Sequence, residues 1–135
     1  RGKWLFKFLR CICVRERGSN ITALKAGLDA LRKNGVIGIF PEGRVSREGR
    51  LQEGISGIGF LVKKSRAAVI PAFIFGTYEA LPKGAKLLKP SRIKIIFGKP
   101  MIFKDDGSGS QRQTITEITG QIMEQIEKLS FSIRV

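Results

Sequence analysis

The residues of this chain best suited to chemistry lie directly after an apolar run, in the segment Phe40-Pro41-Glu42-Gly43-Arg44-Val45-Ser46. Pro41 cannot donate a ladder hydrogen bond and therefore ends a strand, and Gly43 permits positive φ or a close ligand. The Arg44 guanidinium can contact a phosphate through two hydrogen bonds. The Glu42 carboxylate could accept from a substrate hydroxyl or hold the arginine. These residues fit a phosphate-binding site, and taken alone they also fit a plain turn with solvated charges.

Cys11 and Cys13 are the only cysteines, and the chain contains no histidine. Without histidine, a zinc site or a Cys–His nucleophile is excluded, so we expect no bound metal. On a strand the two thiols would share one face, where such close positions seldom form a strain-free disulfide. We therefore expect two buried free thiols in a reducing compartment.

The composition is strongly basic, with 25 Lys and Arg against 11 Asp and Glu and a formal net charge of +14. Such a charge attracts nucleic acid, anionic lipid headgroups, or an acidic carrier and its phosphorylated cofactor. The chain has no helix-turn-helix pattern, no set of zinc ligands and no aromatic ribonucleoprotein-type strand. Their absence argues against nucleic acid as the partner.

Two basic clusters are candidates for the surface that meets an anion. The first, residues 3–10, interleaves cations with aromatic side chains, which suits a helix lying on an anionic membrane or an ordinary packing helix with a solvated side. The second precedes residue 93 and could meet a membrane or a carrier, or simply be exposed. The cations are Lys3, Lys7 and Arg10 in the first cluster, and Lys83, Lys86, Lys89 and Arg92 in the second.

Continuous apolar runs predict four strands, and apolar residues at helical spacing predict three helices. Because the strands do not alternate with polar residues, both faces of the sheet should be covered. The fold class we expect is α/β: one domain over 1–135, with a layered, mostly parallel or mixed sheet and helices on both faces. Ligands bind beyond the carboxyl ends of such strands, where residues 40–46 lie. The expected strands are 11–14, 36–40, 69–74 and 93–98, and the expected helices are 21–31, 55–65 and 111–129.

The segment Phe40-Pro41-Glu42-Gly43 closely resembles the glycerolipid-phosphate motif of the lysophospholipid (1-acylglycerol-3-phosphate) acyltransferases, in which a serine and a glycine like Ser46 and Gly49 follow. Further blocks resemble the same family over about residues 10–103. They are Ile12-Cys13-Val14 with the arginines after it, Gly57 with the helix through Lys63-Lys64-Ser65, Val69-Ile70-Pro71-Ala72, Gly76-Thr77 and Ile96-Phe97-Gly98-Lys99-Pro100.

This resemblance implies transfer of a fatty acyl chain from acyl-CoA or acyl carrier protein to a lysophospholipid acceptor, expected to be lysophosphatidate, at an anionic membrane surface. It implies a location on the cytoplasmic side of the membrane, peripheral or anchored through sequence upstream of Arg1. Either Arg15 or Arg17 could be the family's upstream phosphate-contacting arginine, and we favour Arg17. The implied phosphate-binding residues are Arg17, Glu42, Gly43, Arg44 and Ser46, and the implied structural residues are Phe40, Pro41, Gly57 and Pro71.

The sequence departs from the family pattern in two places. The family usually reads Pro-Glu-Gly-Thr-Arg-Ser, whereas here Arg44 comes one place early and Val45 takes the usual arginine position. The family also has His-x4-Asp before the first strand, where the His is the general base and the Asp orients it. We expect truncation before Arg1 or, alternatively, a non-catalytic module that binds lipid phosphate or an acyl carrier. Either way, this chain alone should transfer little acyl group.

Overall fold

The computed structural model describes residues 8, 10–12, 14, 20–46, 48–82, 84–85, 87–104 and 111–132. The chain divides into two compact units, Arg1–Gly38 and Ile39–Val135, which are described separately. The expectation of a single domain stays a prediction. No helix in the described ranges is long and apolar enough to cross a membrane. The basic stretch expected at 3–10 lies outside the described residues, except for exposed Phe8 and Arg10.

The first unit contains one well-defined helix, α2 (Ile21–Arg32), which confirms the helix predicted at 21–31. Its end follows the Schellman pattern, in which a left-handed residue lets two further N–H groups reach back to the last turn. Asn34 has φ +56° and donates to the Leu31 carbonyl at 3.0 Å, and Gly35 donates to the Ala30 carbonyl at 2.9 Å. Asn34-Gly35 therefore ends the helix, as its residue types predict.

The first two expected strands are not formed among the described residues. Cys11, Ile12 and Val14 are exposed and not in a strand, and residues 36–40 run without a sheet partner. The prediction of a buried thiol is wrong for Cys11, which is a free and exposed cysteine; Cys13 lies outside the described residues. An apolar run becomes a strand only where a neighbour takes its backbone hydrogen bonds, and the run at 36–40 also contains Gly38, which weakens a strand.

The second unit contains a two-stranded antiparallel sheet of β1 (Ala72–Phe75) and β2 (Lys94–Phe97), in which Phe73 lies opposite Ile96. A bridge between Val69 and Met101 extends the pairing. The last two predicted strands are thus confirmed, and this pair is antiparallel, where a mostly parallel or mixed sheet was expected. The apolar pattern of each run predicts a strand but not the direction of its partner, so the sense of the pair could not be read from the pattern. The connection between β1 and β2 contains the short helix α4 (Thr77–Ala80).

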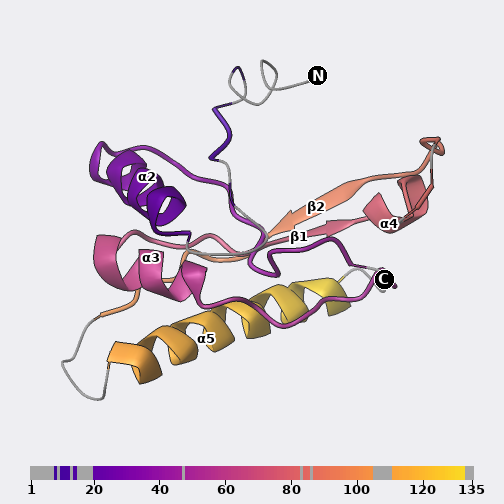
Figure 1. Cartoon of the computed structure of the whole chain (residues 1–135). Helices are drawn as coiled ribbons and strands as arrows, with labels where there is room; N and C mark the ends of the chain where they lie inside the picture. The colour runs from indigo at the N-terminus through magenta and orange to yellow at the C-terminus, as the bar shows by residue number, and fades with distance from the viewer. Residues whose placement is uncertain are drawn as a thin grey trace. The chain divides into compact units, whose positions relative to one another are not determined.

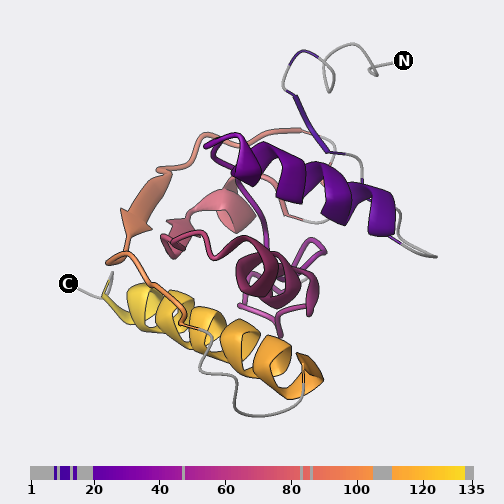
Figure 2. The same ribbon diagram turned by 90° about the vertical axis from the view of Figure 1, so that its left-hand side faces the viewer.

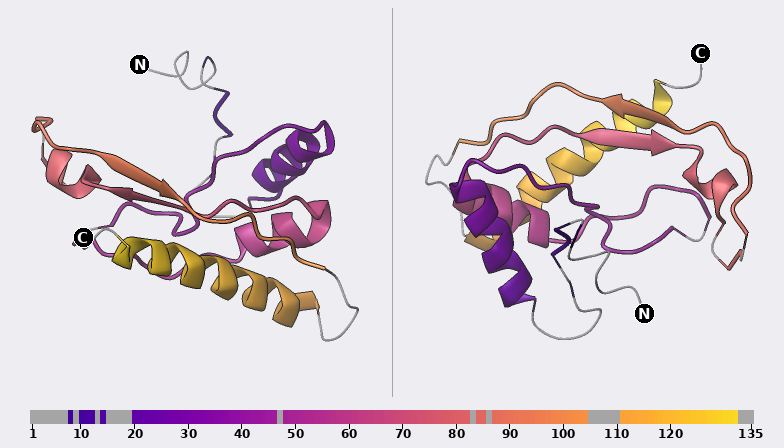
Figure 3. Two further views of the ribbon diagram at one scale, coloured as in Figure 1. Left: turned by 180° about the vertical axis from the view of Figure 1, so that it is seen from behind. Right: turned by 90° about the horizontal axis from the view of Figure 1, so that it is seen from above.

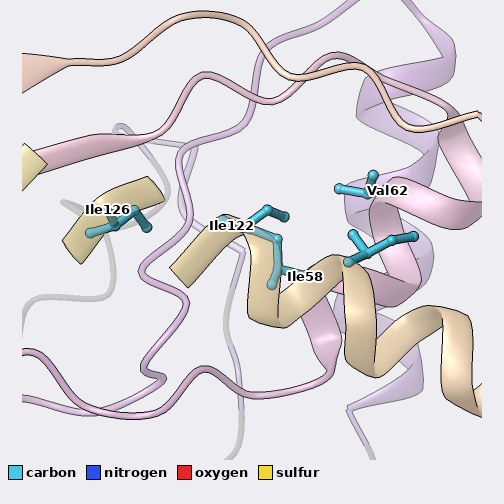
Figure 4. Close-up of a cluster of buried hydrophobic side chains, with 5 residues drawn as sticks. Ile58, Val62, Ile122 and Ile126 are labelled. Carbon is cyan, nitrogen blue, oxygen red and sulfur yellow. The ribbon is translucent and has the colours of Figure 1, made fainter. Parts of the chain in front are cut away.

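The core of the second unit lies between α3 (Gly57–Ser65), α5 (Gln111–Phe131) and the sheet (Figures 1 and 2). Two residues of α3 meet an isoleucine stripe of α5 (Figure 4). The helices approach closely because Gly59 has no side chain: a Cβ there would lie 2.5 Å from Thr119 Oγ1 and against the Ile115 carbonyl. The apolar stripe that predicts a helix at 111–129 thus supplies Ile118, Ile122 and Ile126 to the core. The cluster consists of Ile58, Val62, Ile118, Ile122 and Ile126, with Leu51, Val69, Phe73, Met101, Phe103 and Met123 packed against it.

Candidate phosphate-binding site

The candidate site begins with a tight turn from Phe40 to Gly43. The Gly43 N–H donates to the Phe40 carbonyl at 3.1 Å, and Pro41, whose ring fixes φ, takes the second position, where turns favour proline. Gly43 has φ +64°, and a Cβ added there would lie 2.8 Å from Ile55 Cδ1. The positive φ therefore favours glycine at position 43, and a Cβ there would also have to push aside the end of the Ile55 side chain.

Two hydrogen bonds close the loop that follows this turn. The Ile55 N–H donates to the Pro41 carbonyl at 2.8 Å, and the Gln52 N–H donates to Glu42 Oε2 at 2.9 Å. Glu42 is half-buried, so its carboxylate has a backbone partner in a partly dry setting. The segment from Pro41 to Ile55, here called the motif loop, is consequently a compact loop with its ends held together.

The suggestion that Glu42 holds Arg44 is not supported by the geometry. In the part of the chain that the structure describes, the ion pairs are Arg32–Asp29 at 3.7 Å and Lys128–Glu124 at 2.7 Å, both exposed. Glu42 is occupied by a backbone N–H, whereas Arg44 is exposed. The carboxylate shapes the loop and leaves the guanidinium accessible to an anion from outside.

The far end of the motif loop is held by its own contacts. The Ser46 hydroxyl donates to the Arg50 carbonyl at 2.9 Å. Gly49 has φ +70°, and a Cβ added there would lie 2.8 Å from Cγ of Tyr78, at the start of α4. The backbone of the loop therefore rests on an aromatic ring. Contact with a ligand phosphate would require the Ser46 hydroxyl to turn from its present acceptor.

The structure brings four of the five predicted phosphate-binding residues into one loop: Glu42, Gly43, Arg44 and Ser46. Arg17, and with it Arg15, lies outside the described residues, so the choice between them stays a prediction.

The predicted structural residues lie in and beyond the loop. Phe40 and Pro41 form the turn, with Phe40 75% exposed. Gly57 is the first residue of α3. Pro71 is buried beside the sheet, where its carbonyl accepts from the Gly98 N–H at 2.8 Å.

Sequence reasoning missed the residues that hold the loop in shape. Gln52 and Ile55 act through backbone N–H groups, which every non-proline residue possesses, so no residue type marks them. Tyr78 is distant in sequence from Gly49. The one available signal was Gly49 itself, whose place in the motif indicates a backbone requirement.

With this geometry established, comparison with known proteins defines the class. The family model for acyltransferases matches residues 2–75, more than half of the chain, and the chain belongs to this family. The resemblance carried by Phe40-Pro41-Glu42-Gly43 is thereby confirmed.

Particular relatives are similar over part of their length. Over 84 residues, or 62% of this chain and 24% of each relative, the chain is 31% identical to the chloroplastic 1-acyl-sn-glycerol-3-phosphate acyltransferase LPAT1 of Arabidopsis thaliana and 29% identical to chloroplastic BAT2 of Brassica napus. The crystal structure of PlsC, the 1-acyl-sn-glycerophosphate acyltransferase of Thermotoga maritima, matches with a TM-score of 0.68 and 25% identity. That match covers 95% of this chain and 51% of PlsC. It confirms the α/β class, and the chain spans about a quarter of these curated relatives and half of the solved one.

Proposed function

We propose that this chain binds the phosphate of a lysophospholipid, with 1-acylglycerol-3-phosphate as the expected acceptor, as part of an O-acyltransferase of phospholipid synthesis. The observation that carries the proposal is the exposed Arg44 on a loop whose ends are held by Pro41 and Glu42. The names of the similar proteins support the same acceptor.

Each residue of the motif loop has a separate task in this proposal. Arg44 supplies two N–H donors to the phosphate oxygens. Glu42 positions the loop through Gln52 and makes no contact with the ligand. Gly43 gives the turn its left-handed residue. Ser46 exchanges its hydrogen bond to the Arg50 carbonyl for one to the phosphate. From the resemblance alone, Arg17 is proposed as the family's upstream phosphate-contacting arginine.

The reaction we propose needs an acyl thioester, from acyl-CoA or acyl carrier protein, as donor. The free hydroxyl oxygen of the acceptor attacks the thioester carbonyl carbon. A carbon–oxygen ester bond forms, the carbon–sulfur bond breaks, and the thiolate leaves. The hydroxyl proton passes to a general base and then to the leaving sulfur. That base is a histidine in the family pattern, and these 135 residues include none.

The test is the affinity of the 135-residue chain for a short-chain lysophosphatidate, measured by calorimetry. Arg44→Ala should weaken binding about tenfold to a hundredfold, because a charged hydrogen-bond donor is worth about 1.5–3 kcal/mol. Arg44→Lys should restore only part of the affinity, since an ammonium lacks the planar pair of donors.

The matched control is Arg50→Ala, an exposed arginine of the same loop whose backbone carbonyl, the acceptor for Ser46, is retained. It removes the same charge and should change affinity little. Equal losses for both variants would mean that the loop attracts anions only through general charge, and the role given to Arg44 would be wrong.

One observation favours a second candidate, a non-catalytic module that binds lipid phosphate or an acyl carrier. The absence of histidine leaves this chain without the usual base for acyl transfer. The module would show the same binding and the same loss in Arg44→Ala. Only turnover separates the two candidates.

A further inference from the structure

The connection between β1 and β2 stands apart from the core of its unit. β1 ends at Phe75, α4 follows, and the chain re-enters the sheet at Lys94. Figures 1 and 3 show α4 and this connection at the end of the hairpin away from α3. We call its described residues, 76–82, 84–85 and 87–92, the hairpin tip.

The hairpin tip exposes large apolar side chains. Leu87 is 80% exposed, Leu88 is 75% exposed, and Leu81 is 47% exposed. Single exposed hydrophobic residues are ordinary, but here two leucines adjacent in sequence are exposed at the end of a projecting connection. Neither belongs to the core of the unit.

Hydrogen bonds hold the tip in this arrangement. The Lys89 N–H donates to the Ala80 carbonyl at 2.8 Å, across the connection. The Ser91 hydroxyl donates to the Gly76 carbonyl at 3.2 Å. The leucines lie in sequence between the residues that these hydrogen bonds join, so the fold of the connection keeps them exposed.

The charge around the leucines is mainly positive, although the tip also contains one exposed acid, Glu79 of α4. Lys89 and Arg92 are exposed beside them. From Leu81 to Lys104 the sequence has no Asp or Glu. The cations of that stretch are Lys83, Lys86, Lys89, Arg92, Lys94, Lys99 and Lys104.

Exposed leucines bordered by cations match the interface of an anionic bilayer. Apolar side chains enter the boundary between headgroups and acyl chains, while ammonium and guanidinium groups stay with the phosphates. We propose that the hairpin tip docks on an anionic lipid surface, with Leu87 and Leu88 in the acyl boundary and Lys89 and Arg92 at the headgroups. The docking needs no acyl transfer and goes beyond the proposed function.

The tip also adjoins the motif loop, because Tyr78 of α4 lies against Gly49. A lipid surface held by the tip would thus be near the loop that carries Arg44. This step alone rests on the proposed function, since it takes lysophosphatidate as the molecule collected from that surface. The docking can be tested without it.

The test is co-sedimentation of the 135-residue chain with phosphatidylcholine vesicles, with and without phosphatidylglycerol. The chain should bind only the anionic vesicles. Leu87→Ser combined with Leu88→Ser should weaken partitioning by about tenfold or more, and Lys89→Ala should weaken it about fivefold. The matched control is Ile102→Ser, because Ile102 is 73% exposed outside the tip; it should bind like the original chain.

A fluorescence measurement covers the case in which the serine variant fails to fold. In a Trp4→Phe background, Leu88→Trp should shift its emission to the blue when anionic vesicles are added, and Ile102→Trp should not. Undiminished binding by a folded double-serine variant would overturn the proposal. An unshifted Leu88→Trp, or an equal loss for Ile102→Ser, would do the same.

Discussion

In the motif loop, the carboxylate of Glu42 has the Gln52 N–H as its partner at 2.9 Å, and Arg44 is exposed. A charged acceptor makes a stronger hydrogen bond to a backbone N–H than a neutral one does. The same side chain therefore draws the end of the loop back to its start. At the residue scale, we therefore expect one side chain, Glu42, to shape the loop and a different one, Arg44, to contact the ligand.

A substitution series at Glu42 tests this positioning role. Glu42→Ala should speed hydrogen exchange of the Gln52 amide about tenfold, because the hydrogen bond, worth about 1.5 kcal/mol, is lost. Glu42→Gln should speed it less, since the amide oxygen can still accept. The Ile55 amide, which donates to the Pro41 carbonyl, is the internal control. An unchanged Gln52 amide in Glu42→Ala would contradict the role.

Some residues of the site could be predicted from the sequence, whereas the contacts that shape the loop could not. Pro41, Gly43 and Arg44 lie close together in the sequence. Proline and glycine favour turns and arginine binds anions, so these three residues could be identified from the sequence. The partner of Glu42 could not, because the bond is made to a backbone N–H ten residues away. The same limit applies to Tyr78, which meets the loop only through the fold.

At the scale of elements, helices and strands differed in how far the sequence determined them. The helices α2, α3 and α5 carry their apolar stripes within their own residues, and all three were predicted. A strand needs a partner from elsewhere in the chain, and the apolar runs at 11–14 and 36–40 show no ladder among the described residues. The antiparallel sense of β1 and β2 depends on how two separate strands pair, and no apolar pattern within either strand records it.

The close packing of α3 on α5 predicts that alanine substitutions at two glycines change the free energy of unfolding in opposite directions. A Cβ at Gly59 would collide with the Ile115 carbonyl, whereas a Cβ at Gly120 would meet nothing within 4 Å. Gly59→Ala should lower the free energy of unfolding by about 1–3 kcal/mol through overpacking. Gly120→Ala, in the middle of α5, should raise it by about 0.5–1 kcal/mol.

Urea unfolding followed by circular dichroism measures both changes. The comparison is internally controlled, because the two substitutions add the same methyl group to helical glycines. Stabilisation by Gly59→Ala would show that the helices can separate without cost, and the close approach of α3 and α5 would then not be required.

At the scale of the whole molecule, binding and turnover should separate. The chain has exposed cations for an anionic ligand, but no histidine among its 135 residues. We expect this chain to bind lysophosphatidate and to transfer no measurable acyl group from acyl-CoA or acyl carrier protein. The assay is release of free thiol from each donor in the presence of lysophosphatidate.

The informative comparison is the product of the whole open reading frame that encodes these residues, assayed under the same conditions. Turnover by that protein and not by the 135-residue chain would support the enzyme. Silence from both, with lysophosphatidate binding intact, would favour the binding module. Turnover by the 135-residue chain by itself would show that acyl transfer does not need a histidine base.

The closure of the motif loop bears on how its sequence can vary. The hydrogen bonds that join its ends are made by Pro41, Glu42, Gln52 and Ile55. The residues at positions 44 and 45 take no part in these bonds. Both side chains are exposed. An arginine can consequently move one place along the loop without loosening its ends. The order Arg44-Val45, which differs from the usual family order, is thus compatible with the same loop conformation.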